Sequence, residues 1–157
     1  MEIIEAKTED AEPILALQKL AYISEAEIVG DYNIPPLTQT LEEIIEEFKQ
    51  RLILKAVVKT KRLLKKKIIG SVRAHLENGT CFIGKLIVDP DHQKKGIGTK
   101  LMNEIEVRFE HAKRFELFTS SKSQKNIYLY QKLGYNIFKE EKINETLTLV
   151  YLEKKVK

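Results

Sequence analysis

A glycine-bearing turn between two apolar segments constrains the fold of this chain more than any other feature. The turn reads Gln93-Lys94-Lys95-Gly96-Ile97-Gly98-Thr99 and follows the apolar run Leu86-Ile87-Val88 and the turn-forming Asp89-Pro90-Asp91. Apolar residues then recur at helical spacing, at positions 97, 101, 102, 105, 109 and 112. The pattern therefore predicts a strand, a short loop and a long amphipathic helix, in that order.

The composition of this turn predicts that it binds an anion. Gly96 and Gly98 have no Cβ, so a bulky ligand can approach the backbone closely. The amides of the first helical turn have no partner within the helix and lie at the positive end of its dipole. A phosphate is the natural ligand of such a site, and Lys94 and Lys95 add positive charge to it. The alternative is an ordinary glycine turn that precedes a helix.

Two better-known phosphate-binding patterns do not fit these residues. A dinucleotide-binding fingerprint would need its third glycine at the position of Leu101. A P-loop would need a glycine directly before its lysine, whereas Thr99 precedes Lys100. What remains is Gln-x-x-Gly-x-Gly between a predicted strand and a predicted helix.

Length and charge limit the class of protein. With 157 residues the chain is long enough to bury a core, and residues 1–157 are expected to form a single domain. The net charge is +4, but acidic pairs such as Glu42-Glu43 are interspersed with the basic residues, which argues against nucleic-acid binding. The single Cys81 excludes an internal disulfide, no apolar run approaches the length of a membrane span, and the first residues begin no signal peptide. We therefore expect a cytoplasmic protein that binds neither nucleic acid nor membrane, and the spacing of its three histidines predicts no metal site.

Periodicity and turn residues predict the other elements. Strands are expected at residues 2–6, 53–58, 68–76, 81–88, 115–119, 135–138 and 147–152. Helices are expected from Thr8 or Asp10 to about Tyr22, after the capping residue Thr40, and over 125–133. Residues 24–37 show no clear period, so a loop is expected there, with a helical piece near 25–29. The basic segment 59–67 is interpreted as the solvated tip of a hairpin.

A second motif follows the glycine turn, with one predicted strand between the two. It reads Asn126-Ile127-Tyr128-Leu129-Tyr130-Gln131-Lys132-Leu133-Gly134-Tyr135 and resembles the Leu-Tyr-x-Lys-Leu-Gly-Phe/Tyr segment of the GNAT acetyltransferase superfamily. The Gln-x-x-Gly-x-Gly turn resembles the pyrophosphate-binding motif of the same superfamily. The resemblance covers roughly Ile3 to Leu152. It implies an α+β fold with a mixed sheet of about seven mostly antiparallel strands, four helices and a splayed central pair of strands.

The resemblance also implies a reaction and a cofactor site. GNAT enzymes transfer an acetyl group from acetyl-CoA to a primary amine, which attacks the thioester directly through a tetrahedral intermediate. By resemblance, the backbone of Leu86, Ile87 and Val88 pairs with the pantetheine arm and stabilises the carbonyl oxygen. The residues expected to hold the pyrophosphate are Gln93, Lys94, Lys95, Gly96, Ile97, Gly98 and Thr99. The alternative is a non-catalytic module that binds acetyl-CoA or CoA.

Tyr130 matches the family tyrosine near the cofactor sulfur, where it can act as general acid by donating its proton to the departing thiolate. Its alternative role is aromatic packing. Asn126 lies four residues earlier, on the same helical face, and is expected to contact the pantetheine arm. Many relatives carry their asparagine at the position that Ser123 occupies here, so Ser123 and Asn126 are both candidate cofactor ligands.

The general base and the acceptor stay open at this stage. Several relatives carry a glutamate at the position of Gly84. Deprotonation must then pass through water, through His75, whose imidazole suits proton transfer at neutral pH, or through an acidic residue of the early loop. Glu25, Glu27 and Asp31 in that loop are expected to bind a cationic amine. The acceptor is either a small-molecule amine or an amine of a peptide or protein, and a homodimer is the expected assembly.

Overall fold

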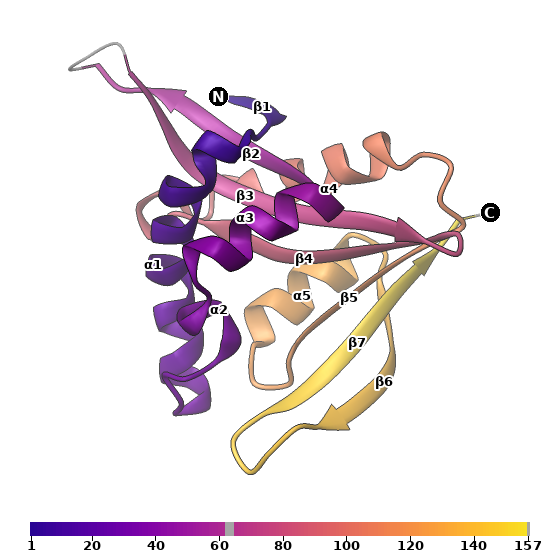
Figure 1. Ribbon diagram of the computed structural model, residues 1–157. Helices are drawn as coiled ribbons and strands as arrows, with labels where there is room; N and C mark the ends of the chain where they lie inside the picture. The colour runs from indigo at the N-terminus through magenta and orange to yellow at the C-terminus, as the bar shows by residue number, and fades with distance from the viewer. Residues whose placement is uncertain (62–64, 157) are drawn as a thin grey trace.

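The protein is described by a computed structural model that covers residues 1–61 and 65–156. The strands are β1 (Glu2–Glu5), β2 (Leu52–Lys59), β3 (Lys66–Glu77), β4 (Thr80–Val88), β5 (Arg114–Ser120), β6 (Asn136–Lys142) and β7 (Thr148–Lys155). They form one open sheet in the order β1-β2-β3-β4-β5-β7-β6 (Figure 1). Neighbouring strands are antiparallel except β4 and β5, which are parallel. The predicted mixed, mostly antiparallel sheet is confirmed.

Helices cover both faces of this sheet. The described residues form the helices α1 (Ala11–Val29), α2 (Pro35–Thr38), α3 (Leu41–Gln50), α4 (Ile97–Arg108) and α5 (Gln124–Lys132). The first three lie in front of the sheet in Figure 1, and α4 and α5 lie behind it. The prediction of four helices missed α2, a single turn whose first residue is Pro35. Proline suits that position, because its fixed φ is helical and its missing N–H would have no partner there.

Helix α1 is longer than the sequence predicted. It continues past Tyr22 to Val29, so the helical piece expected near 25–29 is present but is continuous with α1, and no loop begins at Ser24. Ala26 and Val29 continue the buried stripe of the helix, which explains why it persists. The helix ends at Gly30, which adopts the left-handed conformation with φ 73° and donates its amide to the carbonyl of Ala26. Glu25 and Glu27 therefore lie on a helix and not in a loop.

The cap predicted for α3 is present as a reciprocal pair of hydrogen bonds. The Glu43 amide donates to Thr40 Oγ1 at 3.2 Å, and the Thr40 amide donates to Glu43 Oε1 at 3.0 Å. Helix α4, by contrast, ends at Arg108, whereas the apolar pattern predicted that it would extend to Ala112. Ala112 is buried nevertheless, in the loop that leads to β5, and its burial explains why it fitted the helical pattern.

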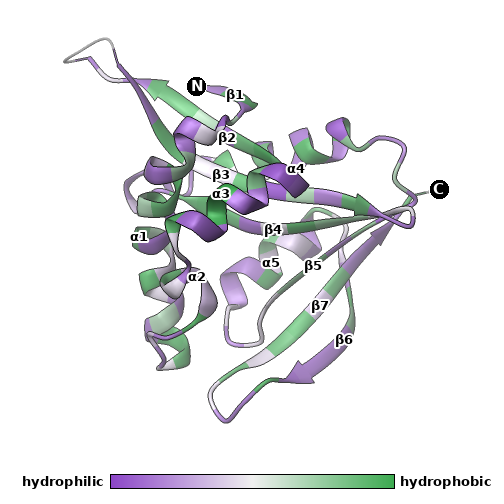
Figure 2. Ribbon diagram, viewed as in Figure 1, coloured by the Kyte–Doolittle hydropathy of each residue, from purple (hydrophilic) through white to green (hydrophobic). Residues whose placement is uncertain are grey.

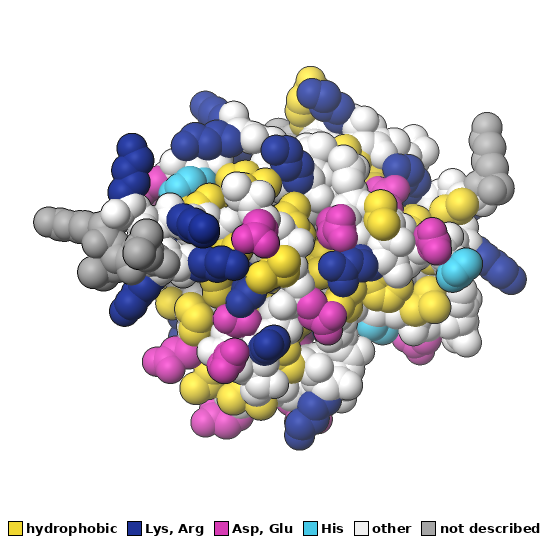
Figure 3. Space-filling view, turned by 90° about the horizontal axis from the view of Figure 1, so that it is seen from above, with side chains coloured by type: hydrophobic (Ala, Val, Ile, Leu, Met, Phe, Trp, Pro, Cys, Tyr) yellow, Lys and Arg dark blue, Asp and Glu magenta, His cyan; other side chains and the backbone are white. Residues whose placement is uncertain are grey.

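Two tight hairpins set the order of the strands. Asn78 and Gly79 join β3 to β4 with φ values of 50° and 81°, as their pairing between two strands predicted. The closing hairpin of β6 and β7 is also confirmed. The basic hairpin tip 59–67 falls partly on residues 62–64, which lie outside the described residues. The hairpin itself is present, but its strands pair as far as Lys59 and Lys66, which were expected to belong to the tip. In Figure 3, basic and acidic side chains are interspersed on the face seen from above.

Apolar side chains fill both sides of the sheet. The larger cluster lies on the side of α4 and α5 and includes Val72, Leu101 and Met102, all fully buried. The smaller one joins Ile14 of α1 and Ile44 of α3 to the strands. Each fully buried side chain of this size contributes about 1.5–3 kcal/mol of hydrophobic stabilisation. Figure 2 shows the contrast with the edge strand β6, which is largely hydrophilic and exposed along its whole length.

A buried arginine ties α1 and α3 to the sheet. Arg73 of β3 is 1% exposed, and its guanidinium donates to Glu47 Oε2 at 2.6 Å, to Gln39 Oε1 at 3.2 Å and to Gln18 Oε1. Gln18, on an otherwise apolar face of α1, also donates to Gln39 and to the carbonyl of Pro36. A buried charge is tolerated only when it is paired and hydrogen-bonded, and this network supplies both.

Candidate functional site

The candidate site lies where the two central strands part. β4 and β5 pair over three residues only, from Thr80↔Arg114 to Phe82↔Glu116. Beyond Phe82, β4 continues to Val88 and pairs on this side with none of the described strands, and β4 and β5 diverge in front of α5 (Figure 1). The predicted splay of the central pair is thereby confirmed. It leaves an unpaired strand edge, which is a ready hydrogen-bonding surface for an extended ligand.

A bulge reshapes β4 at this opening. Ser71 pairs with Ile87 and Arg73 with Gly84, so Lys85 and Leu86 together oppose the single residue Val72. Lys85 takes a left-handed conformation with φ 52°, which is unfavourable for a residue with a Cβ. Bulges of this kind re-aim side chains next to active sites. A Cβ at Gly84 would meet no atom within 4 Å, so the place where relatives carry a glutamate is open space here.

The glycine turn lies beside the same opening and presents a row of backbone amides. Lys94 and Gly96 both have positive φ, at 63° and 77°. Among the residues that the structure describes, none accepts a hydrogen bond from the amides of 94–99, and the first bond of α4 is donated by Lys100 to Gly96. Lys125 of α5 donates to Gln93 Oε1 at 2.9 Å and so holds the turn against α5. The arrangement can bind an anionic group at the start of α4.

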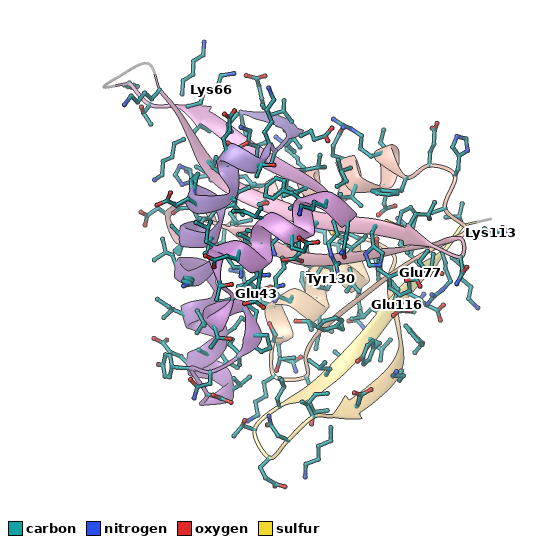
Figure 4. The ribbon with its side chains drawn as sticks, in the orientation of Figure 1. Glu43, Lys66, Glu77, Lys113, Glu116 and Tyr130 are labelled. Carbon is teal, nitrogen blue, oxygen red and sulfur yellow. The ribbon has the colours of Figure 1, made fainter. Side chains whose placement is uncertain are left out.

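Tyr130 lies at the centre of the site (Figure 4). Its side chain is 7% exposed, yet its hydroxyl makes no hydrogen bond within the described residues and is not a fully enclosed polar atom. Burial, followed by electrostatic coupling to the Tyr22 phenol and the Glu25 carboxylate, raises the pKa of Tyr130 above its ordinary value, so its phenol keeps its proton.

Glu25 brings the predicted acceptor side and cofactor side together. Its Oε1 accepts from Ser123 Oγ at 2.7 Å and from Asn126 Nδ2 at 3.3 Å. Asn126 also donates to Thr119 Oγ1 at 3.4 Å. Next to them, burial and then the charge of Glu25 raise the pKa of Tyr22 to about 12. One carboxylate from α1 thus contacts both residues that were predicted to bind the pantetheine arm.

The other predicted acceptor and base residues do not converge on this point. Glu27 is exposed on α1, and Asp31 Oδ1 accepts from the amide of Asn33 at 2.8 Å within a turn. His75 pairs in register with Phe82, at the closed end of the strand pair, and stacks on its ring at 5.3 Å. Its Nδ1 accepts from Arg51 Nη1 at 3.2 Å, so that lone pair is occupied.

Two residues near the site, Lys85 and Tyr22, were not predicted from the sequence. Lys85 was missed because a bulge has no sequence signature beyond a break in alternation. Tyr22 was missed because the helix was expected to end there. In the sequence, the network around Arg73 is indicated by Gln18, a polar residue within an otherwise apolar stripe of a helix.

Neither a membrane span nor a metal centre is visible in the part of the chain that the structure describes. Over residues 1–61 and 65–156, no helix combines the length and hydropathy needed to cross a bilayer. The same residues contain no group of three or more His, Cys, Asp or Glu side chains placed to hold a metal ion.

Solved structures from several bacteria and an archaeon share this fold. The PaiA N-acetyltransferase of Thermoplasma acidophilum, crystallised with coenzyme A, is 18% identical, with a TM-score of 0.79 over 99% of this chain and 98% of that one. The ribosomal-protein-S18-alanine N-acetyltransferase of Escherichia coli is 14% identical, with a TM-score of 0.77 over 99% and 93%. The protein smu.2055 of Streptococcus mutans is 17% identical, with a TM-score of 0.82 over the whole of both chains.

A curated relative is similar in sequence over part of its length. It is the UPF0157 protein YqkA of Bacillus subtilis, 29% identical over 125 residues, which are 80% of this chain and 34% of that protein. The chain thus spans about a third of the length of the curated relative that it matches.

The sequence also matches a known protein family over most of its length. The match runs over residues 18–135 and includes the glycine turn, the parting strands and the helix that carries Tyr130. Those are the elements that form the site described above. The chain therefore belongs to the acetyltransferase (GNAT) family.

Proposed function

We propose that this protein transfers an acetyl group from acetyl-CoA to a primary amine, by direct attack of the amine on the thioester. One observation carries the proposal: the unpaired edge of β4 and the free amides of 94–99 lie beside α5, the helix that carries Tyr130. The coenzyme A complex of the Thermoplasma neighbour supports it. When bound, acetyl-CoA supplies an acetyl group activated as a thioester, with a thiol as its leaving group.

The residues around the glycine turn fit a pyrophosphate. Gly96 has φ 77°, and a Cβ there would meet no atom within 4 Å, so the backbone is open to a ligand. The amides of 94–99 would bind the phosphate oxygens, and the exposed Lys94 and Lys95 would add charge. The edge formed by Leu86, Ile87 and Val88 would pair with the pantetheine amides as a further strand. Ser123 and Asn126 border the same opening through their bonds to Glu25.

Tyr130 is the proposed general acid. Because burial keeps its phenol protonated, it can donate a proton to the sulfur as the thiolate departs. A backbone amide on the free edge of β4 would stabilise the negative charge that develops on the carbonyl oxygen. Neither role requires movement of a charged side chain.

Glu25 is the proposed contact for the acceptor amine. It is the acidic residue of the predicted set that lies beside Tyr130, and its Oε1 is already positioned by Ser123 and Asn126. It would attract the ammonium and accept a proton from it, directly or through water. His75 is the weaker base assignment, because Arg51 occupies its Nδ1. We assign no role to Glu27, which is exposed on α1, or to Asp31, which accepts from the amide of Asn33 within a turn.

An amine screen tests the proposed reaction. Release of free thiol from acetyl-CoA is followed in the presence of a panel of amines, with the wild-type protein and with Tyr130→Phe. A general acid typically contributes on the order of 10²–10⁴ in rate, so kcat of Tyr130→Phe is expected to fall at least about 100-fold with little change in stability. Tyr128→Phe, on the exposed side of the same helix, serves as the control. Full turnover by Tyr130→Phe would refute the acid assignment, and binding of acetyl-CoA without turnover of any amine would favour the non-catalytic module.

A second variant tests the pyrophosphate site without reference to catalysis. A Cβ at Gly98 would lie 3.6 Å from Leu129 Cδ2, an ordinary contact, so Gly98→Ala should fold normally and even gain helix propensity. If phosphates approach this backbone, the added methyl should weaken CoA binding about tenfold or more, measured by calorimetry. Asn103→Ala, an exposed change on the same helix, should bind CoA as the wild type does. Unchanged affinity in Gly98→Ala would move the pyrophosphate away from this turn.

A further inference from the structure

Lys85, at the bulge of β4, is surrounded by charged groups of β3, α3 and the residue that follows α3. Glu47 and Glu43 stabilise its charge, whereas Arg73 and Arg51 oppose it. Burial is the main reason that the pKa of Lys85 lies below its ordinary value. These neighbours belong to the side of the sheet that α3 covers, so the bulge aims the ammonium toward that side and away from α5.

The carboxylates near Lys85 are already engaged by other groups. Glu47 Oε2 accepts from Arg73 at 2.6 Å, and Glu47 Oε1 lies 3.4 Å from Arg51 Nε. Glu43 Oε1 accepts from the Thr40 amide as part of the helix cap. Lys85 itself forms no ion pair with any residue that the structure describes. Three cations therefore share two carboxylates, and one positive charge is left without a counter-ion.

Both ends of the site carry a charged group, of opposite sign. Lys85 lies on the part of β4 that has no partner in β5 beyond Phe82, next to Gly84, the register partner of Arg73. Helix α1 contacts β3 and β4 along this stretch, and Glu43 lies on the side of the sheet that faces the viewer in Figure 4, as α1 does. Lys85 therefore lies on the β4 side of the gap, and Glu25 lies on the β5 side, where it contacts Ser123 and Asn126 and Asn126 contacts Thr119 of β5.

We infer that the acceptor is a small amine that also carries a carboxylate, with its amine bound toward Glu25 and its carboxylate toward Lys85. The inference rests on the proposed transferase function. A partly buried ammonium without a counter-ion is unfavourable, and the carboxylate of a ligand would supply the missing charge. Hydrogen bonds between two charged groups are also among the strongest that a binding site can offer.

A contact between the α1–α2 region and the hairpin of β6 and β7 favours a small acceptor over a peptide. Leu147, in the turn between β6 and β7, packs with Ala26, Val29 and Ile34 of the α1–α2 region. These contacts bridge the space between the helices and the closing hairpin. An extended polypeptide would have to separate them, whereas an amino-acid-sized ligand would not.

Matched acceptors test the inference. Amino acids with the amine and the carboxylate separated by one, two or three carbons are each compared with their carboxamides, and thiol release is followed for each pair. The wild type is expected to prefer at least one acid over its amide by about 10- to 100-fold in kcat/KM. The spacing that gives the largest preference measures the distance from the reacting amine to Lys85.

Substitutions of Lys85 then assign the preference to one residue. Lys85→Met keeps an unbranched side chain, one heavy atom shorter, and removes its charge, so the ratio of acid to amide should fall to near one, mainly through KM. Lys85→Arg should retain most of the preference, and Lys19→Met, exposed on α1, should behave as the wild type.

Each alternative result has a distinct meaning. Equal turnover of acids and amides, or a preference that survives in Lys85→Met, would overturn the inference and leave the transferase proposal intact. Acetylation of peptides in place of free amino acids would overturn the small-acceptor part. A screen in which no amine at all releases thiol would count against the transferase proposal itself.

Discussion

Strands β1–β4 are covered by helices on both faces, whereas β5, β7 and β6 are covered on one. Residues 69–74 of β3 are buried without interruption, as in a strand enclosed on both sides. In β5, Leu117 faces α5 and is 3% exposed, while the adjacent Phe118 faces the other way and is 56% exposed. The side that Phe118 faces is the side that α1 and α3 cover in the other half of the sheet.

The difference shows where the fold places stability and where it leaves room for a ligand. The half enclosed by helices pairs most of its buried polar groups internally, through Arg73, Gln18, Gln39 and Glu47. Within the described residues, the Nε atoms of Arg73 and Arg51 are buried there without a hydrogen-bond partner. The open half instead presents an aromatic surface on which Phe118 and Phe138 lie against Tyr151, at 5.6 and 6.3 Å between ring centroids.

The largest expected contrast is between two arginines, one in each half. Arg73→Met removes the buried partner of Glu47 and leaves Gln18 Oε1 without its donor, so it should cost about 3–5 kcal/mol of unfolding free energy. Arg114→Met removes ion pairs to Glu116 and Glu153, at 3.0 and 3.2 Å and partly solvated, and should cost only about 1 kcal/mol. Denaturation by urea measures both values. Equal losses would mean that the enclosed half does not depend on its buried network.

Two adjacent residues of β5 sharpen the comparison within one strand. Leu117→Ala creates a cavity against α4 and α5 and should cost about 2–5 kcal/mol. Phe118→Ala, on the open face, should cost less than about 1 kcal/mol. If Phe118→Ala proved as costly as Leu117→Ala, something would have to cover the open face in solution. The same denaturation experiment decides between these outcomes.

The smallest effect expected is a loss of stability in alkali, carried by the buried tyrosines where the two halves meet. Burial raises the pKa of Tyr22 to about 12 and also raises the pKa values of Tyr130 and Tyr135, whose hydroxyl donates to Glu106 at 3.2 Å. In the unfolded chain these phenols ionise near pH 10. Their contribution is therefore fully present below pH 10 and is lost as the pH rises toward 12, because the unfolded state releases the protons first.

Thermal unfolding between pH 8 and pH 11 checks this expectation. The midpoint should be steady up to about pH 9.5 and then fall. Tyr135→Phe should reduce the slope of that fall, because it removes one of the phenols that stays protonated in the folded state. A slope that is unchanged in this variant would mean that other groups cause the alkaline loss.

Much of the fold could be predicted from local chemistry. Asn78-Gly79, the cap at Thr40 and Gly134 after α5 each carry a backbone preference that needs no tertiary context. The glycine turn was predictable for the same reason. The end of α1 was not, because Ser24 breaks the apolar period on the solvent side while Ala26 and Val29 continue it on the buried side. Only the packing against the sheet shows which side decides.

The site was less predictable than the fold, because its residues meet across long sequence distances. The motif at 126–135 identified Tyr130 and Asn126, but nothing in the sequence indicated that Asn126 would bind Glu25. Lys85 depends on one extra residue in β4, which shifts its side chain relative to the regular alternation. A single sequence does not reveal such a shift.

Because β4 and β5 pair over a short stretch only, hydrogen–deuterium exchange can detect a ligand that binds between them. Past Phe82, the amides of β4 that point toward β5 have no acceptor among the described residues. In the free protein they should therefore take up deuterium quickly, although they lie in the middle of the sheet. A ligand arm that lies along that edge would slow the uptake there and nowhere else in β4. Mass spectrometry of deuterium uptake would thus locate docking directly, even in a variant that cannot turn over.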